Sequence, residues 1–221
     1  MNHTFADMKT LRARLQSEAE PRYRDFTARL IPGQCRLLGV RLPKLRAMAK
    51  QLAQQGIWRL PTPADAYMEE LMLRGMVIGY VRGVAPAALL AELEHFVPLI
   101  ANWSVCDSCC ATYTFARRNR EAVWEWLRQY WASEDEFKAR FGVVMLLNHF
   151  CRDAGWASRV AAALPAVPAR GYYAEMAVAW CACELIIHHP HLADSLGASL
   201  RPGVHKLMLR KLRESRRSPR L

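Results

Sequence analysis

The sequence predicts an all-α protein made of antiparallel helix pairs. Apolar residues recur at helical spacing in nearly every segment, and the connections are short and often contain glycine or proline. No stretch alternates between apolar and polar residues for long enough to indicate a strand. Because 52% of the 221 residues are hydrophobic, the chain can bury one sizeable core. We therefore expect one continuous domain over residues 1–221, with a frayed tail from about residue 216.

Proline and glycine mark the helix ends along the chain. Pro32 and Gly33 end an N-terminal helix, and Pro43 fits the first turn of a helix that ends near Gly56. After Pro63 the helical pattern is regular. The other expected helices cover residues 6–19, 22–30, 65–82, 87–100, 104–117, 121–131, 134–151, 157–164, 172–188 and 204–216.

Four of these helices carry similar runs of small and apolar residues. The runs begin at Arg74, Asp107, Arg140 and Met176, so successive starts are 33, 33 and 36 residues apart. A period near this value is typical of helical solenoids, in which each helix pair buries its apolar face on its neighbours. If the helices stack in register, these four positions line one side of the solenoid, with Trp180 one turn after Met176.

Cysteine usage indicates reduced thiols packed as small apolar residues. The chain has seven cysteines, an odd number, and most of them lie in apolar helical stretches. Cys106 and Cys109 have the spacing of a zinc or redox pair, but no second pair of this kind occurs. We therefore expect neither a metal nor another cofactor.

The formal net charge of +11 is concentrated in three clusters. Residues 201–220 contain eight basic side chains against Glu214 alone, a net charge of +7. Such clusters are expected for binding a polyanion, above all nucleic acid, although solvated helix faces are the alternative. The other two clusters are Arg36, Arg41, Lys44, Arg46 and Lys50, and Arg117, Arg118 and Arg120.

The sequence also gives an expectation for location. No apolar run approaches the roughly 18 residues that a membrane helix needs. The first fifteen residues are polar and charged where a signal peptide would be apolar. We expect a cytoplasmic protein that does not interact with membranes.

Trp103 and Asp107 are the main candidates for a functional site. Residues four apart on a helix lie on one face, so this aromatic ring and this carboxylate are expected to be neighbours. A partly buried acid is costly to desolvate unless it meets a partner or a ligand. The alternative is that Trp103 and Trp180 are core residues and that Asp107 pairs with Arg140.

Five segments, in order along the chain, resemble a known family. Together they are similar to the bacterial DNA alkylation repair family of HEAT-like repeat DNA glycosylases, the AlkD type. The resemblance implies a C-shaped α-solenoid of HEAT-like antiparallel helix pairs, a monomer, whose basic concave face holds double-stranded DNA. The segments are GVRLPKLRAMAKQL at residues 39–52, NWSVCDS at 102–108, FKARFGVVMLLNHF at 137–150, YYAEMAVAW at 172–180 and KLRESRR at 211–217.

The resemblance also implies an activity and a set of site residues. Active members hydrolyse the N-glycosidic bond of cationic N3- and N7-alkylated purines without a deep base-flipping pocket. By position in the motifs, Asp107 would be catalytic, and Trp103, Trp180 and Arg140 would bind the lesion-bearing nucleotide. The basic residues assigned to the DNA backbone are Lys44, Arg46, Arg74, Lys211 and Arg213.

The segment before residue 38 departs from the active enzymes. These enzymes have a helix there that contacts DNA near the lesion, whereas Pro32 and Gly33 interrupt any long helix in this chain. The chain therefore resembles a variant subfamily with a shortened N-terminal DNA-contacting region. Three functions stay open: an alkylpurine DNA glycosylase, associated with the nucleoid when bound to DNA; a non-catalytic binder of duplex or branched DNA; and a helical-repeat scaffold for an acidic protein.

Overall fold

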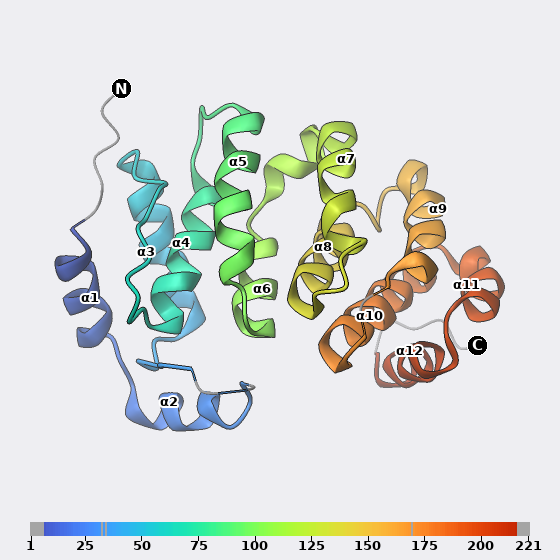
Figure 1. Cartoon of the computed structure of the whole chain (residues 1–221), viewed down its shortest axis with the longest axis horizontal. Helices are drawn as coiled ribbons and strands as arrows, with labels where there is room; N and C mark the ends of the chain where they lie inside the picture. Colours follow the sequence, from blue (N-terminus) through green and yellow to red (C-terminus); the bar gives the residue numbers. More distant parts are fainter. Residues whose placement is uncertain (1–6, 32, 34, 169, 216–221) are drawn as a thin grey trace. The chain divides into compact units, whose positions relative to one another are not determined.

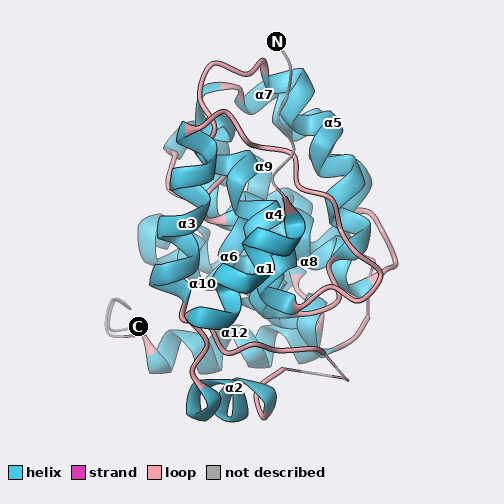
Figure 2. Cartoon of the chain, turned by 90° about the vertical axis from the view of Figure 1, so that its left-hand side faces the viewer, coloured by secondary structure: helices cyan, strands magenta, loops and turns pink. Residues whose placement is uncertain are grey.

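The computed structural model describes residues 7–31, 33, 35–168 and 170–215 (Figure 1). Over these residues the chain forms α-helices, short 3-10 helices and loops but no strand, so the all-α prediction is confirmed (Figure 2). Pro32 and the expected tail from residue 216 lie outside the described residues. The α-helices are α1 (Met8–Ser17), α2 (Pro21–Ala28), α3 (Leu42–Gln54), α4 (Met68–Tyr80), α5 (Pro86–Phe96), α6 (Trp103–Cys110), α7 (Arg120–Trp131), α8 (Glu136–His149), α9 (Ala154–Ala163), α10 (Tyr172–His188), α11 (Ala193–Ser199) and α12 (Pro202–Glu214).

The chain divides into two compact units, Met1–Phe115 and Ala116–Leu221. Each unit has its own buried apolar core. The expectation of one continuous domain stays a prediction. None of the described helices is both long enough and apolar enough to cross a membrane.

Helix α4 is the centre of the first unit, where it packs against α3, α5 and α6. Two glycines on α4 allow this close packing. A Cβ atom at Gly75 would clash with the ring of Phe96 on α5 and the thiol of Cys109 on α6, and a Cβ atom at Gly79 would clash with Thr112. The small thiol of Cys109 thus fills the space at a helix contact, as expected for a core cysteine.

The segment before α3 is attached to the N-terminal turn of α4. The buried carboxylate of Glu69 accepts hydrogen bonds from the backbone N–H groups of Leu38, Gly39 and Val40, at 3.1, 2.7 and 3.3 Å. Gly39 has a φ of +91°, and a Cβ atom there would lie 2.6 Å from the carbonyl oxygen of Glu20. Only glycine fits this position without strain. These contacts fix the position of the segment that connects α2 to α3.

Helix α10 is the centre of the second unit, and it packs against α8 and α12. Helix α7 packs on the other side of α8 and supplies aromatic side chains to the core. The ring of Trp124 on α7 lies 4.7 Å from that of Trp131, 5.8 Å from that of Phe150 and 5.3 Å from that of Trp156, measured between centroids. These aromatic contacts join α7, α8 and α9.

One expectation about helix extent was wrong, and one short helix was not predicted. The helix expected over residues 104–117 ends at Cys110, and a 3-10 helix follows at Thr114–Arg118. The hydroxyl of Thr112 donates to the carbonyl of Cys109 at 2.7 Å, a side-chain bond that competes with helix continuation. Helix α11, with seven residues, was too short to show a helical period in the sequence.

Candidate functional site

Trp103 and Asp107 lie one turn apart on the partly exposed side of α6. The helix begins after Asn102, whose side-chain oxygen accepts the N–H of Val105 at 3.0 Å. The other side of the helix is buried in the core of the first unit through Val105, Cys106, Cys109 and Cys110. The core therefore holds α6 so that an aromatic ring and a carboxylate remain accessible together.

The loop after α2 contacts Trp103 directly. The indole N–H of Trp103 donates to the carbonyl oxygen of Leu30 at 3.1 Å. Helix α2 has no buried residue, and the side chain of Phe26 is 52% exposed. The basic side chains of this segment, also exposed, are Arg22, Arg24 and Arg29. A positively charged segment thus ends beside the candidate aromatic residue.

Arg140 is buried inside the second unit, at 4% exposure. Its guanidinium donates to the carbonyl oxygen of Tyr173 at 2.7 Å, while Glu136, one turn earlier on α8, accepts the N–H of Tyr173 at 2.6 Å. The ring of Phe137 stacks on that of Tyr173 with 5.5 Å between centroids. Arg140 therefore helps to clamp the first turn of α10 onto α8.

Trp180 is partly exposed on α10, and the ammonium nitrogen of Lys211 on α12 lies 5.8 Å from its ring centroid. This distance is typical of a cation–π contact. The structure thus brings together two residues that the sequence assigned to nucleotide binding and to the DNA backbone. Arg213, the other α12 residue of that assignment, is exposed.

The basic residues on α3 differ in how far they are neutralised. Lys44 pairs with Glu18 at 2.8 Å, and it also lies 3.7 Å from Glu20. Lys50 and Arg46 instead lie beside Tyr80 on α4. The nitrogen of Lys50 is 5.4 Å from the Tyr80 ring centroid, and burial raises the pKa of the Tyr80 hydroxyl while the charge of Arg46 opposes that rise.

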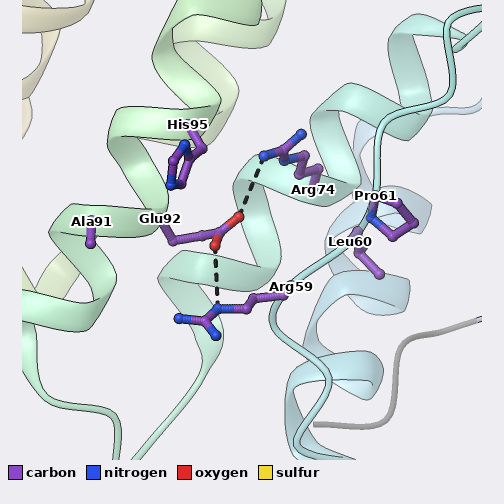
Figure 3. A pocket seen from close by; sticks show the side chains of 7 residues that line it. All are labelled: Arg59, Leu60, Pro61, Arg74, Ala91, Glu92 and His95. Carbon is purple, nitrogen blue, oxygen red and sulfur yellow. Dashed lines mark hydrogen bonds and ion pairs between the residues drawn. The ribbon is translucent and has the colours of Figure 1, made fainter.

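Arg74, the remaining residue assigned to the DNA backbone, faces α5. Its guanidinium donates to the hydroxyl of Thr62 and to the carboxylate of Glu92. Glu92 also pairs with Arg59 at 3.3 Å. These three charged residues line a hollow of about 450 Å³ with Leu60, Pro61, Ala91 and His95 (Figure 3).

Sequence reasoning missed this hollow because its charged residues come from three separate segments with no shared motif. Arg59 lies in the loop after α3, Arg74 on α4, and Glu92 on α5. The weak signal available was an acid on the apolar side of the helix expected over residues 87–100, where it requires a partner.

The four residues expected at the lesion are distributed over both units. Trp103 and Asp107 belong to the first, whereas Arg140 and Trp180 belong to the second. Within its own unit, each pair is placed by the contacts described above. A site that combines all four stays a prediction.

The cysteines of α6 are buried thiols. Burial raises the pKa of Cys109 and of Cys110 well above the usual value, so both are protonated and poorly suited to bind metal. In the described part of the chain, no three histidine, cysteine or acidic side chains are grouped so that they could hold a metal ion.

Comparison with known proteins identifies one match. A family model described as DNA alkylation repair enzyme matches residues 11–193, which is most of the chain and includes Trp103, Asp107, Arg140 and Trp180. No curated protein and no solved structure matches.

Proposed function

Because the chain belongs to the DNA alkylation repair enzyme family, we propose that it is a DNA glycosylase that hydrolyses the N-glycosidic bond of cationic N3- and N7-alkylated purines in duplex DNA. The family membership supports a role in DNA alkylation repair. The observation that carries the specific reaction is the pairing of Trp103 with Asp107 on the accessible side of an otherwise buried helix.

The reaction requires few protein groups, because the substrate already carries a positive charge on the base. When the N-glycosidic bond breaks, both bonding electrons remain with the purine, which leaves as a neutral molecule without a general acid. Positive charge then develops on the sugar, where a carboxylate stabilises it. Asp107 supplies this carboxylate. A water oxygen bonds to the anomeric carbon, and the proton that this water releases passes to Asp107 or to solvent.

Trp103 contributes an aromatic surface beside the carboxylate. The face of an indole ring attracts cationic groups, so Trp103 favours the charged nucleotide over a neutral one. Its N–H bond to the carbonyl of Leu30 fixes the orientation of the ring. In the second unit, Trp180 with Lys211 offers a similar combination of aromatic ring and positive charge. The lesion-binding roles of Trp180 and Arg140 rest on the family resemblance.

We assign binding of the DNA backbone first to basic side chains without an acidic partner among the described residues. In the first unit these include Arg46, Lys50, Arg22 and Arg29, whereas Arg24 pairs with Asp25 at 2.9 Å. Lys44 makes a smaller contribution, because Glu18 already neutralises it. We further propose that the chain acts as a cytoplasmic monomer whose helix pairs stack as a HEAT-like solenoid.

The deciding experiment is single-turnover release of 7-methylguanine and 3-methyladenine from methylated duplex DNA. Asp107→Asn keeps the shape of the side chain and removes its charge, so we expect about a 10²–10⁴-fold slower release with duplex binding retained. Asp194→Asn is the matched control, because Asp194 is exposed on α11 and belongs to the second unit. Equal rates for the wild type and Asp107→Asn would remove Asp107 from the mechanism.

A second candidate function is supported by two contacts. Arg140 is buried and bonded to Tyr173, and the indole N–H of Trp103 is bonded to Leu30, so both of these expected site residues already have partners within the fold. A protein that binds duplex or branched DNA without excision fits these contacts. Absence of base release from any alkylated duplex, together with affinity that falls steeply as salt rises, would establish this function.

A further inference from the structure

We propose that the hollow between α4, α5 and the loop after α3 binds a phosphate group. This inference does not rest on the proposed glycosylase function. The hollow has a volume of about 450 Å³, with charged side chains beside the apolar side chains of Leu60, Pro61 and Ala91 (Figure 3). The sequence assigned Arg74 to the DNA backbone, and the reaction at Asp107 uses none of the residues that line the hollow.

The charges of the hollow leave an excess of one positive charge. Two guanidinium groups, those of Arg59 and Arg74, share the single carboxylate of Glu92, which lies between them (Figure 3). The side chains of Arg74 and Glu92 are only 13% and 11% exposed. Charges as buried as those of Arg74 and Glu92 interact strongly, and with Arg59, which is 39% exposed, the excess positive charge favours an anion in the hollow.

Hydrogen-bond donors in the hollow also exceed the acceptors. The Nε atom of Arg74 is buried and has no hydrogen-bond acceptor in the described part of the chain, whereas the buried Nε atom of Arg59 lies 3.3 Å from a carboxylate oxygen of Glu92 without hydrogen-bond geometry. Buried donors are normally satisfied, so the unsatisfied Nε atom of Arg74 indicates a missing acceptor in the hollow. A phosphate has several acceptor oxygens and can draw Glu92 away from one guanidinium or bind beside it.

Arg59 is the residue best placed to meet the anion. Its guanidinium lies 4.4 Å from the ring centroid of Trp58, which orients the planar group. Figure 3 shows its terminal nitrogens pointing away from Arg74, while its Nε atom faces the carboxylate of Glu92 at 3.3 Å. The fork of an arginine matches two oxygens of one phosphate. His95 lines the same hollow and can donate a further hydrogen bond.

The test uses inorganic phosphate titrated into the full chain at constant ionic strength, with thermal unfolding as the readout. At ten times the dissociation constant, binding raises the folded-to-unfolded ratio of the wild type about elevenfold. Arg59→Gln should lose this increase. Arg82→Gln is the control, because Arg82 is an exposed arginine of the same unit that does not line the hollow. Phosphate also stabilises proteins in general by exclusion from their surfaces, so the difference between the variants is the result that counts.

A second pair of variants keeps the proposal testable if Arg59→Gln does not fold. Ala91 is exposed and lines the hollow, so Ala91→Glu adds a repelling carboxylate without disturbing the core. Ala87→Glu adds the same charge to α5 at an exposed position that does not line the hollow. We expect Ala91→Glu to lose the phosphate effect and Ala87→Glu to keep it.

Duplex DNA distinguishes the two sources of the phosphate. If Arg59→Gln also weakens duplex binding at least threefold, the hollow takes a phosphate of a DNA strand. If duplex affinity is unchanged while the response to inorganic phosphate is lost, the hollow takes a free phosphate. An equal response to phosphate in the wild type, Arg59→Gln and Ala91→Glu, with equal duplex affinity, would overturn the proposal and make the three charges a structural ion-pair group.

Discussion

Asp107 on α6 and Arg140 at the junction of α8 with α10 both begin similar runs of small and apolar residues in the sequence, yet the structure places them differently. On α6, Asp107 is partly exposed beside Trp103. At the junction, Arg140 is 4% exposed and bonds to the backbone of Tyr173. The first residue of such a run can therefore remain accessible in one unit and hold two helices together in the other. Burial and partners decide which role a charged residue takes.

The largest expected effect tests the structural role of Arg140. Arg140→Ala removes the donor to the carbonyl of Tyr173 and leaves a cavity, so we expect a loss of about 2–4 kcal/mol in the free energy of unfolding. Urea unfolding of the full chain measures it. Lys138→Ala, on the same helix, removes a cation that bonds to no described residue and should cost less than about 0.5 kcal/mol. Equal stability of the two variants would show that the contact of Arg140 with Tyr173 does not stabilise the fold.

Asp107→Asn completes that comparison, because its effect should appear in the reaction and not in stability. We expect its free energy of unfolding to remain within about 1 kcal/mol of the wild type. A loss as large as that of Arg140→Ala would mean that both residues serve mainly to hold the fold together.

The next effect concerns the anchor of the segment that reaches Trp103. Gly39→Ala adds a Cβ atom 2.6 Å from the carbonyl of Glu20 at a positive φ, so we expect a loss of about 1–3 kcal/mol and a shifted NMR signal of the Trp103 indole N–H. Gly83→Ala is the matched control, since Gly83 has a φ of +72° but open space around it. If the indole signal moves equally in both variants, the anchor at Gly39 does not control the position of Trp103.

A smaller effect is expected from the indole hydrogen bond itself. Trp103→Phe keeps an aromatic ring but removes the donor to Leu30, at a cost of about 0.5–1.5 kcal/mol. Amide hydrogen exchange should become faster over residues 22–31. Trp180→Phe, in the other unit, should leave exchange in this segment unchanged. Unaltered exchange in Trp103→Phe would show that the bond does not hold the segment.

The smallest effect depends on pH and on exposed charges of the first unit. Hydrogen bonds from Arg12 and Arg36 lower the pKa of Asp65 to about 2. The unfolded value is about 3.9, so this carboxylate stabilises the fold above about pH 4, and the stabilisation is lost as the pH falls from about 4 to 2. The melting temperature of Asp65→Asn should lie below that of the wild type at pH 6, and the two should converge only below about pH 2. A difference in melting temperature that does not change with pH would show that the lowered pKa of Asp65 does not contribute to stability.

The basic clusters show that the sequence alone does not predict which charges are neutralised in the fold. The cluster from Arg36 to Lys50 contains no acid, and the sequence therefore indicates a continuous basic surface. In the structure, acids from other segments neutralise part of it: Asp65 pairs with Arg36, Glu20 with Arg41, and Glu18 with Lys44. These pairs join residues 21 to 29 positions apart, which no local pattern reveals.

The sequence by itself determined the helical class, the approximate place of nearly every helix and the shared face of Trp103 and Asp107. These features depend on spacing within a helix turn and on local stop signals, so the information is local. Only the tertiary structure decided that Arg140 is buried, that Arg74 faces Glu92 and that Trp103 bonds to Leu30. Each of these depends on a partner in another segment, because burial and pairing arise only when helices pack.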